Sequence, residues 1–228
     1  ADKRLIGKGD NMSDIGTEVA NKFKENPAIA AMAMVQPLVL RILVDGRPAR
    51  VEEIAKAMGR SVDDTRALVA KLPSVELDSE GSIIGLGLSF IPTAHRIYFE
   101  GRDHVLYTWC VPDALYFPRM LDLSARVLSP CHATKQPISF TVGPNGVQDI
   151  QPSSAVVSWW PNGIRAQDIR GTGCKNQVLF ASPEVAAPWL EKHPGSVVMP
   201  VTEAFDATIR LVEQLEFMPH RPVGTTCR

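Results

Sequence analysis

The first part of the chain carries its apolar residues at helical spacing. Four helices are predicted from this pattern, over residues 13–25, 28–44, 51–58 and 62–72. Pro37 is expected to kink the second helix, Gly59 to end the third and Ser61 to cap the fourth. A hairpin over 75–88, with its turn at 79–81, follows these helices. Helices followed by a hairpin in this order predict a winged helix.

A winged helix usually suggests DNA binding, but one helix argues against that function here. The helix that would enter the major groove carries Asp63 and Asp64 in its first turn. Base-reading helices normally place basic or amide side chains there, and two carboxylates would repel the phosphates. The module is therefore expected to serve as packing or as a lid.

Beyond residue 89 the pattern changes to short strands interrupted by helices. Pro118 is expected to kink or end the first of these helices, and Thr202 to cap the last. Asn145 and Gly146 mark a hairpin turn. Strands are predicted over 96–99, 104–109, 124–128, 138–142, 147–150, 155–159, 177–181 and 197–200, and helices over 114–121, 183–193 and 202–217.

The two halves together predict an α+β protein, in which a winged-helix-like helical domain precedes a mixed, mostly antiparallel α+β domain. The expected boundaries are 1–89 for a polar arm plus the winged-helix-like domain, 90–218 for the α+β domain and 219–228 for a flexible tail.

Composition limits the partners of the chain. Its 228 residues are 45% hydrophobic, which is enough for a sizeable core, and the net charge is −1. This balance gives no basic surface for nucleic acid or for an anionic membrane. No apolar run approaches the roughly 20 residues of a membrane span, and the charged start lacks the apolar segment of a signal peptide. A cytoplasmic location is expected.

Four cysteines are too sparse for a disulfide framework, and none forms a Cys-x-x-Cys pair typical of structural zinc. Cys227 lies in the tail and is expected to be incidental. Cys110 and Asp113 stand three residues apart at the start of a predicted helix, so both side chains lie on one side of its first turn. The helix dipole would favour the thiolate. Alternatively, Cys110 is a buried core residue and Asp113 a first-turn acid that satisfies the dipole.

Cys174 lies in a polar loop before a strand, where it is expected to be accessible, and Lys175 would favour its thiolate. The alternative is an accidental loop cysteine. If folding brought Cys174 close to Cys110, the two thiols and Asp113 would trap a soft metal beside its own acid. Bond breaking at a thiophilic metal centre is the chemistry that such a site suggests.

Two further groups have mainly structural interpretations. Cys131 and His132 are a possible metal or nucleophile pair, but adjacent side chains rarely converge, which favours a structural cysteine. Trp159 and Trp160 are interpreted as core plus turn, with an aromatic wall for an apolar substrate as the alternative.

The chain resembles the organomercurial lyases (alkylmercury lyases) of bacterial mercury resistance. Residues 106–118, with the motif Trp-Cys-x-x-Asp-x-x-x-Phe-Pro, resemble the segment of the first catalytic cysteine and the catalytic aspartate. Residues 78–88 resemble the family's hairpin, and 125–134 its structural-cysteine turn, although Lys135 stands where a glycine is expected. Gly173 and Cys174, with 180–182 beyond them, resemble the second catalytic cysteine.

This resemblance implies cleavage of the carbon–mercury bond by protonolysis, giving a hydrocarbon and Hg(II). It implies that Cys110, Asp113 and Cys174 are catalytic and hold mercury as substrate and product, and that Cys131 is structural. It also implies no cofactor, exchange with small cytosolic thiols, and mercuric reductase as the acceptor of Hg(II). The alternative is a metal-responsive winged-helix transcriptional regulator that senses mercury through its cysteines.

Overall fold

The computed structural model describes residues 15–165 and 168–218, so the polar arm 1–12 and the whole predicted tail 219–228, with Cys227, lie outside the described residues. The helices are α1 (Ile15–Phe23), α2 (Pro27–Leu43), α3 (Val51–Met58), α4 (Val62–Val69), α5 (Val111–Leu121), α6 (Ile169–Thr172), α7 (Pro183–Lys192) and α8 (Val201–Gln214), with short 3-10 helices η1 (Pro161–Gly163) and η3 (Cys174–Asn176). The strands are β1 (Glu76–Leu77), β2 (Ile83–Leu86), β3 (Leu88–Ser89), β4 (His95–Phe99), β5 (Leu106–Thr108), β6 (Ala125–Pro130), β7 (Pro137–Gly143), β8 (Gly146–Gln151), β9 (Val156–Trp159), β10 (Leu179–Phe180) and β11 (Val197–Pro200).

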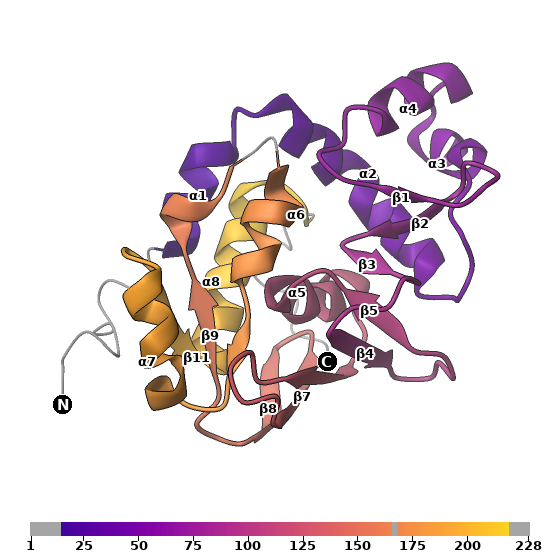
Figure 1. The fold of residues 1–228 in the computed structure, drawn as a ribbon. Helices are drawn as coiled ribbons and strands as arrows, with labels where there is room; N and C mark the ends of the chain where they lie inside the picture. The colour runs from indigo at the N-terminus through magenta and orange to yellow at the C-terminus, as the bar shows by residue number, and fades with distance from the viewer. Residues whose placement is uncertain (1–14, 166–167, 219–228) are drawn as a thin grey trace, which may run out of the picture.

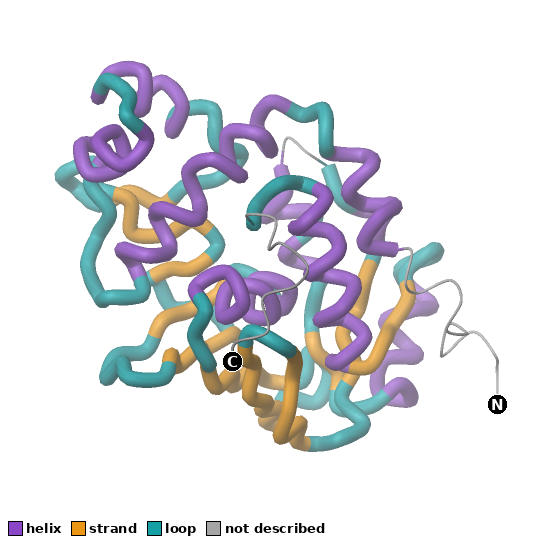
Figure 2. The backbone as a smooth tube through the Cα atoms, turned by 180° about the vertical axis from the view of Figure 1, so that it is seen from behind, coloured by secondary structure: helices purple, strands orange, loops and turns teal. Residues whose placement is uncertain are grey.

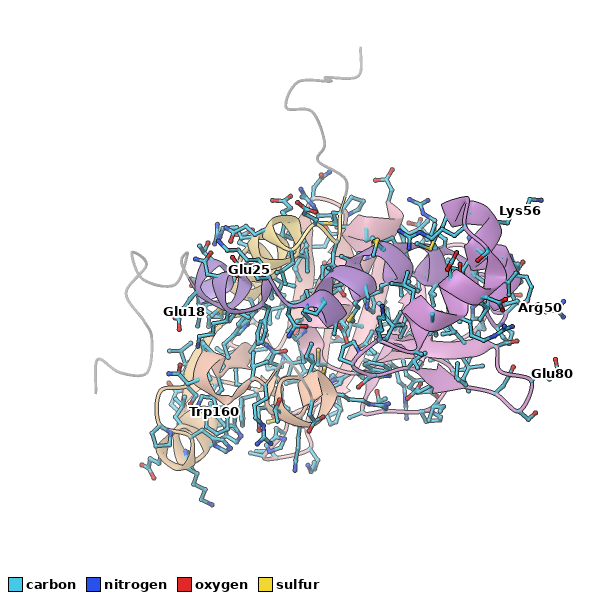
Figure 3. All side chains as sticks on the ribbon, turned by 90° about the horizontal axis from the view of Figure 1, so that it is seen from above. Glu18, Glu25, Arg50, Lys56, Glu80 and Trp160 are labelled. Atoms are coloured by element: carbon cyan, nitrogen blue, oxygen red, sulfur yellow. The ribbon has the colours of Figure 1, made fainter. Side chains whose placement is uncertain are left out.

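The N-terminal module has the predicted order of helices and hairpin. Gly59 ends α3 in the left-handed region, with φ of 63°, and the Ser61 side chain accepts a hydrogen bond from the Asp64 N–H, so both predicted helix signals are confirmed. In Figure 1 α3 and α4 stand beside the β1–β2 hairpin at one end of the molecule. Charged residues such as Arg50, Lys56 and Glu80 are exposed at this end (Figure 3).

An eight-stranded antiparallel sheet joins this module to the rest of the chain. Its strand order is β1-β2-β3-β5-β4-β6-β7-β8, so the N-terminal hairpin continues through the β3–β5 pairing into the strands of the second half. A smaller antiparallel sheet has the order β10-β9-β11. The antiparallel α+β prediction is confirmed, while the domain boundary at residue 89 stays a prediction.

Helix α5 is the central element of the fold. It packs against α2, α8 and β7, and Figure 2 shows it between α2 and the strands below it. Most of its residues are buried, including Phe117, whose side chain belongs to the fully buried core with Trp159, Phe140 and Phe180. The side chains of its first turn therefore lie among several packed elements.

Three local predictions were wrong in detail. Helix α5 starts at Val111, before the predicted 114. It continues through Pro118, so this proline does not end the helix, and the alternative of a kink stays a prediction. Thr202 does not cap α8, since that helix begins one residue earlier, directly after Pro200. Helix α4 ends at Val69, short of the predicted 72, in a turn.

The predicted strand 82–88 is divided at Gly87, whose φ is 83°. A Cβ at this position would lie 2.6 Å from the Phe117 ring and 2.9 Å from the Gln36 amide nitrogen. Glycine therefore lets the chain turn from β2 into β3 directly against α5 and α2.

Within the described residues no single helix is both long and apolar enough to cross a membrane. Helices α1 and α2 taken together pass that test by length and composition only, and they are bent by 109° relative to each other.

Candidate active site

Cys110 and Asp113 are fixed by the join between β5 and α5. Cys110 is the N-cap residue of α5, with extended backbone, and Asp113 lies in the first turn. The hydroxyl of Thr108 donates to the carbonyl of Cys110 over 2.9 Å, which ties the cap to the strand before it. The sequence placed both side chains on one side of this turn, and that prediction is confirmed.

Cys174 comes from a different segment, the consecutive short helices α6 and η3. The Asp168 side chain accepts from the Gly171 N–H at 2.9 Å and caps α6, and the Asn176 amide donates to the Thr172 carbonyl at 2.8 Å. At the end of the segment the Val111 N–H donates to the carbonyl of Gln177 over 3.4 Å. The start of α5 is thereby joined to the residues that follow Cys174.

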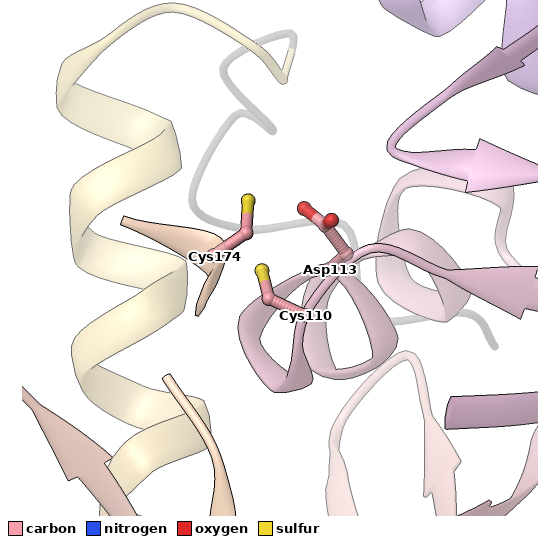
Figure 4. A group of neighbouring side chains, drawn as sticks. All are labelled: Cys110, Asp113 and Cys174. Carbon is pink, nitrogen blue, oxygen red and sulfur yellow. The ribbon is translucent and has the colours of Figure 1, made fainter. Parts of the chain in front are cut away.

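Folding brings Cys110, Asp113 and Cys174 together. One ligand atom from each side chain can be chosen so that all three lie within 4.8 Å of one another. The three side chains point toward a common space in Figure 4. All are buried, with Cys174 only 8% exposed, so the expectation of an accessible loop thiol was wrong: η3 turns the residue inward. Two thiols and a carboxyl at this separation can hold a soft metal and move a proton beside it.

Burial, more than the helix dipole, sets the protonation of the site. It raises the pKa of Cys110 well above the ordinary thiol value, and the neighbouring Cys174 and Asp113 raise it further. The expected dipole-stabilised thiolate was therefore wrong for this state of the site, because desolvation outweighs the dipole.

Burial also raises the pKa of Asp113 to about 7, against the opposing effects of hydrogen bonding by Cys110 and Trp109 and of the positive charge of Arg170. Its Oδ2 atom has no hydrogen-bond partner among the described residues. A carboxyl group of this kind can both accept and give a proton near neutral pH.

An apolar pocket of about 110 Å³ adjoins the three side chains. Helices α1, α2 and α8 supply seven of its eighteen lining residues, four of them from α1 and α2, so the N-terminal module helps to form the site. The lining residues are Val19, Phe23, Ile29, Met32, Cys110, Pro112, Asp113, Tyr116, Ile164, Ile169, Gly173, Cys174, Gln177, Thr208, Leu211, Val212, Leu215 and Phe217. Trp159 and Trp160 are not in this lining, so the aromatic-wall alternative is not supported; Trp159 belongs to the core.

Sequence reasoning missed a buried polar contact beside this pocket. The Tyr116 hydroxyl donates to Gln36 Oε1 over 2.7 Å, and Gln36 Nε2 donates to the Leu86 carbonyl over 3.0 Å. The contact joins α2 to α5. The available signal was Gln36 itself, a polar residue in the longest apolar stretch, which must find a partner when it is buried.

Cys131 lies apart from this group, fully buried in the turn between β6 and β7. Although burial acts to raise its pKa, hydrogen bonds, chiefly from Thr134, outweigh that effect and lower it. His132 packs against Phe180 with ring centroids 5.7 Å apart. Lys135 has a φ of 63°, the left-handed conformation that favours glycine, which explains why a glycine is expected there.

Comparison with known proteins identifies the same two parts of the chain. Residues 88–213 match the family profile "Alkylmercury lyase", and residues 15–87 match "Helix-turn-helix domain of alkylmercury lyase". An alkylmercury lyase of Streptomyces lividans is 38% identical over 201 residues, covering 88% of this chain and 92% of the relative. One of Staphylococcus epidermidis is 37% identical over 196 residues, covering 86% and 89%.

The fold also matches a solved structure described as the crystal structure of the mercury-bound form of MerB2. The TM-score is 0.69 at 23% identity, and the match covers 90% of this chain and 99% of the other.

Proposed function

The chain belongs to the alkylmercury lyase family, whose members cleave carbon–mercury bonds, and on that premise we propose that Cys110, Cys174 and Asp113 carry out the cleavage. The observation that carries the proposal is the convergence of two buried thiols and a carboxyl within 4.8 Å. Mercury prefers thiolate to nitrogen or oxygen ligands, so the two cysteines supply the ligands that the substrate metal requires.

Capture of the organomercurial begins at a protonated thiol. Because burial raises the pKa of Cys110, its sulfur loses a proton only as it bonds to mercury. Asp113 is the nearby acceptor, since its carboxylate is populated at neutral pH and Oδ2 is unpartnered among the described residues. The Hg–X bond breaks as the sulfur bonds, so the products of this step are a Cys110–Hg–R bond, a protonated Asp113 and free X⁻, which later takes the proton of Cys174.

Cys174 completes the reaction as the second thiolate. It adds to mercury and raises electron density on the Hg–C bond, so that carbon becomes basic enough to take the proton from Asp113. The overall reaction balances in hydrogen and electrons: R–Hg–X and two thiols give R–H, HX and Hg(II) bound by two thiolates. One thiol proton leaves on the hydrocarbon and the other on X. Asp113 acts as the proton relay.

The apolar pocket receives the organic group R. Its volume of about 110 Å³ fits a compact alkyl chain, and an engineered apolar cavity of roughly 150 Å³ binds benzene, so a phenyl group needs only slight adjustment. The buried position of Asp113 limits exchange of its proton with water, which keeps that proton available for carbon.

Release of Hg(II) requires another thiol, because a two-thiolate complex of a soft metal dissociates slowly by itself. We therefore infer that small cytosolic thiols exchange onto the mercury and that mercuric reductase accepts it. A cytoplasmic location fits this requirement, since thiols are kept reduced there.

Nucleic acid is not an expected partner, because Asp63 and Asp64 are exposed in the first turn of α4.

Detection of the hydrocarbon separates this function from mercury sensing by a regulator. The protein is incubated with methylmercury or phenylmercury and excess small thiol, and methane or benzene is measured in the gas phase. Release is expected from the native protein. Mercury binding without hydrocarbon would support the regulator.

Both cysteines are expected to be required. Cys110→Ser and Cys174→Ser should each abolish hydrocarbon release while the circular dichroism spectrum stays native. Near-native turnover in either variant removes that residue from the mechanism.

A further inference from the structure

An ion pair joins the N-terminal hairpin to the segment that carries Cys174. Arg170 Nη1 on α6 lies 2.6 Å from Glu76 Oε1 on β1. The Glu76 side chain is only 9% exposed, whereas that of Arg170 is 40% exposed. Because a buried carboxylate without a partner is unfavourable, the pair is more than an ordinary surface contact.

The position of the Glu76 carboxylate is set by the hairpin around it. The hydroxyl of the buried Ser89 donates to its Oε2 atom. Gly85 lies opposite Glu76 in the β1–β2 pairing, and a Cβ at Gly85 would overlap that same oxygen. The hairpin therefore provides both a hydrogen-bond donor and a space that only glycine leaves open. Glu76 is a fixed anchor.

Arg170 links this anchor to both halves of the active site. Its guanidinium lies 4.4 Å from the centre of the Trp109 ring, and Trp109 directly precedes Cys110. Arg170 also lies four residues before Cys174 in the same short segment. The side chains of Asp168 and Thr172 accept from the backbone of Gly171 and Arg165, which are close to them in the chain, whereas Arg170 reaches β1 and Trp109.

We propose that Glu76 is a positioning residue for the reaction: through Arg170 it holds the α6–η3 segment so that Cys174 faces Cys110. This rests on the proposed function, because only a reaction that needs the second thiolate is sensitive to this placement. The positive charge of Arg170 also lowers the pKa of Asp113, which is consistent with a position of Arg170 near that carboxyl group. Displacement of reacting groups by about 1 Å can reduce rates on the order of 100-fold.

The test is Glu76→Gln, which keeps the size of the side chain and removes its charge. Capture by Cys110 is expected to proceed at the native rate, while kcat falls about 10- to 100-fold because Cys174 reaches mercury less often. In a single turnover, quenched samples should contain the R–Hg adduct on Cys110 by mass spectrometry. The native protein should release hydrocarbon without accumulating this adduct.

Asp45→Asn is the matched control. Asp45 pairs with Arg102 at 2.8 Å and likewise joins the N-terminal module to the large sheet, but neither residue lines the pocket or contacts the α6–η3 segment. Its kcat is expected to stay within about twofold of the native value, as for most substitutions of exposed ion pairs. Equal losses of kcat in Glu76→Gln and Asp45→Asn would mean that breaking any ion pair between the N-terminal module and the rest of the chain has the same effect. That result would overturn the proposal.

Arg170→Gln provides a second route if Glu76→Gln does not fold, because Arg170 is more exposed. The double variant is expected to lose no more activity than Arg170→Gln alone, since Glu76 acts only through Arg170, which in addition contacts Trp109 and lowers the pKa of Asp113. Native kcat in the folded variants, with or without a lower melting temperature, overturns the proposal, as does a double variant that multiplies the two losses. If the native protein itself releases no hydrocarbon, the proposed function fails instead.

Discussion

At the scale of the residue, the surroundings of Asp113 decide what the group can do. On an exposed helix it would be a carboxylate throughout the physiological range and a first-turn partner of the dipole. In this protein it lies beside two thiols in an apolar pocket, and burial raises its pKa to about 7. Both protonation states are then populated near neutral pH, which a relay between a thiol and a carbanion-like carbon requires.

A pH dependence follows from this placement. Capture is fastest when Asp113 is a carboxylate that takes the thiol proton, and it is slower when that proton passes to water. The rate of R–Hg attachment to Cys110 should therefore fall as pH drops through about 7 and level off above it. The rate is measured by quenching and mass spectrometry across the neutral range. Asp113→Asn should remove the midpoint. A midpoint above about 9 that survives in the variant would assign the titration to a thiol instead.

At the scale of the element, the first turn of α5 was predictable and the α6–η3 segment was not. Cys110 and Asp113 are close because they stand three positions apart at the start of a helix, and helical periodicity places such side chains on one face. The inward direction of Cys174 depends on packing between segments far apart in the sequence. The residues alone gave its place beside Cys110 only as a condition, and the family resemblance indicated its role. Glu76 and Arg170 gave no local signal, since each is an ordinary charge until the hairpin and α6 meet.

The turn between β6 and β7 carries a separate prediction. Cys131→Ser is expected to lower the unfolding midpoint more than the specific activity, because the thiol is fully buried and lies apart from Cys110 and Cys174. Both quantities are measured on the same preparation. A variant of native stability that released no hydrocarbon would show that Cys131 takes part in the chemistry.

At the scale of the whole molecule, the module with the order of a winged helix forms part of the proposed active site. Its hairpin extends the large sheet, and α1 and α2 contribute Val19, Phe23, Ile29 and Met32 to the pocket wall. The order of elements was visible in the sequence because helix caps and turns are local signals. The joining of both parts into one sheet was not, since strand pairing over long separations leaves no local pattern.

Met32 therefore tests whether the module shapes substrate preference. Met32→Trp fills part of the pocket and should lower kcat/KM for phenylmercury at least about tenfold more than for methylmercury. Met34→Trp is the control, because Met34 lies on the same helix but is 42% exposed and outside the lining. If the ratio of kcat/KM for phenylmercury to that for methylmercury is the same in both variants, the organic group binds outside this pocket.

Delivery of the bond-cleaving proton by Asp113 is tested by a single-turnover measurement on Asp113→Asn. This variant keeps the size and polarity of the side chain but cannot relay a proton. We expect an R–Hg adduct on Cys110 or Cys174 by mass spectrometry and hydrocarbon release slowed by about 10² to 10⁴. Release at the native rate from this variant would remove Asp113 from the mechanism, because the proton would then come from a thiol or water directly.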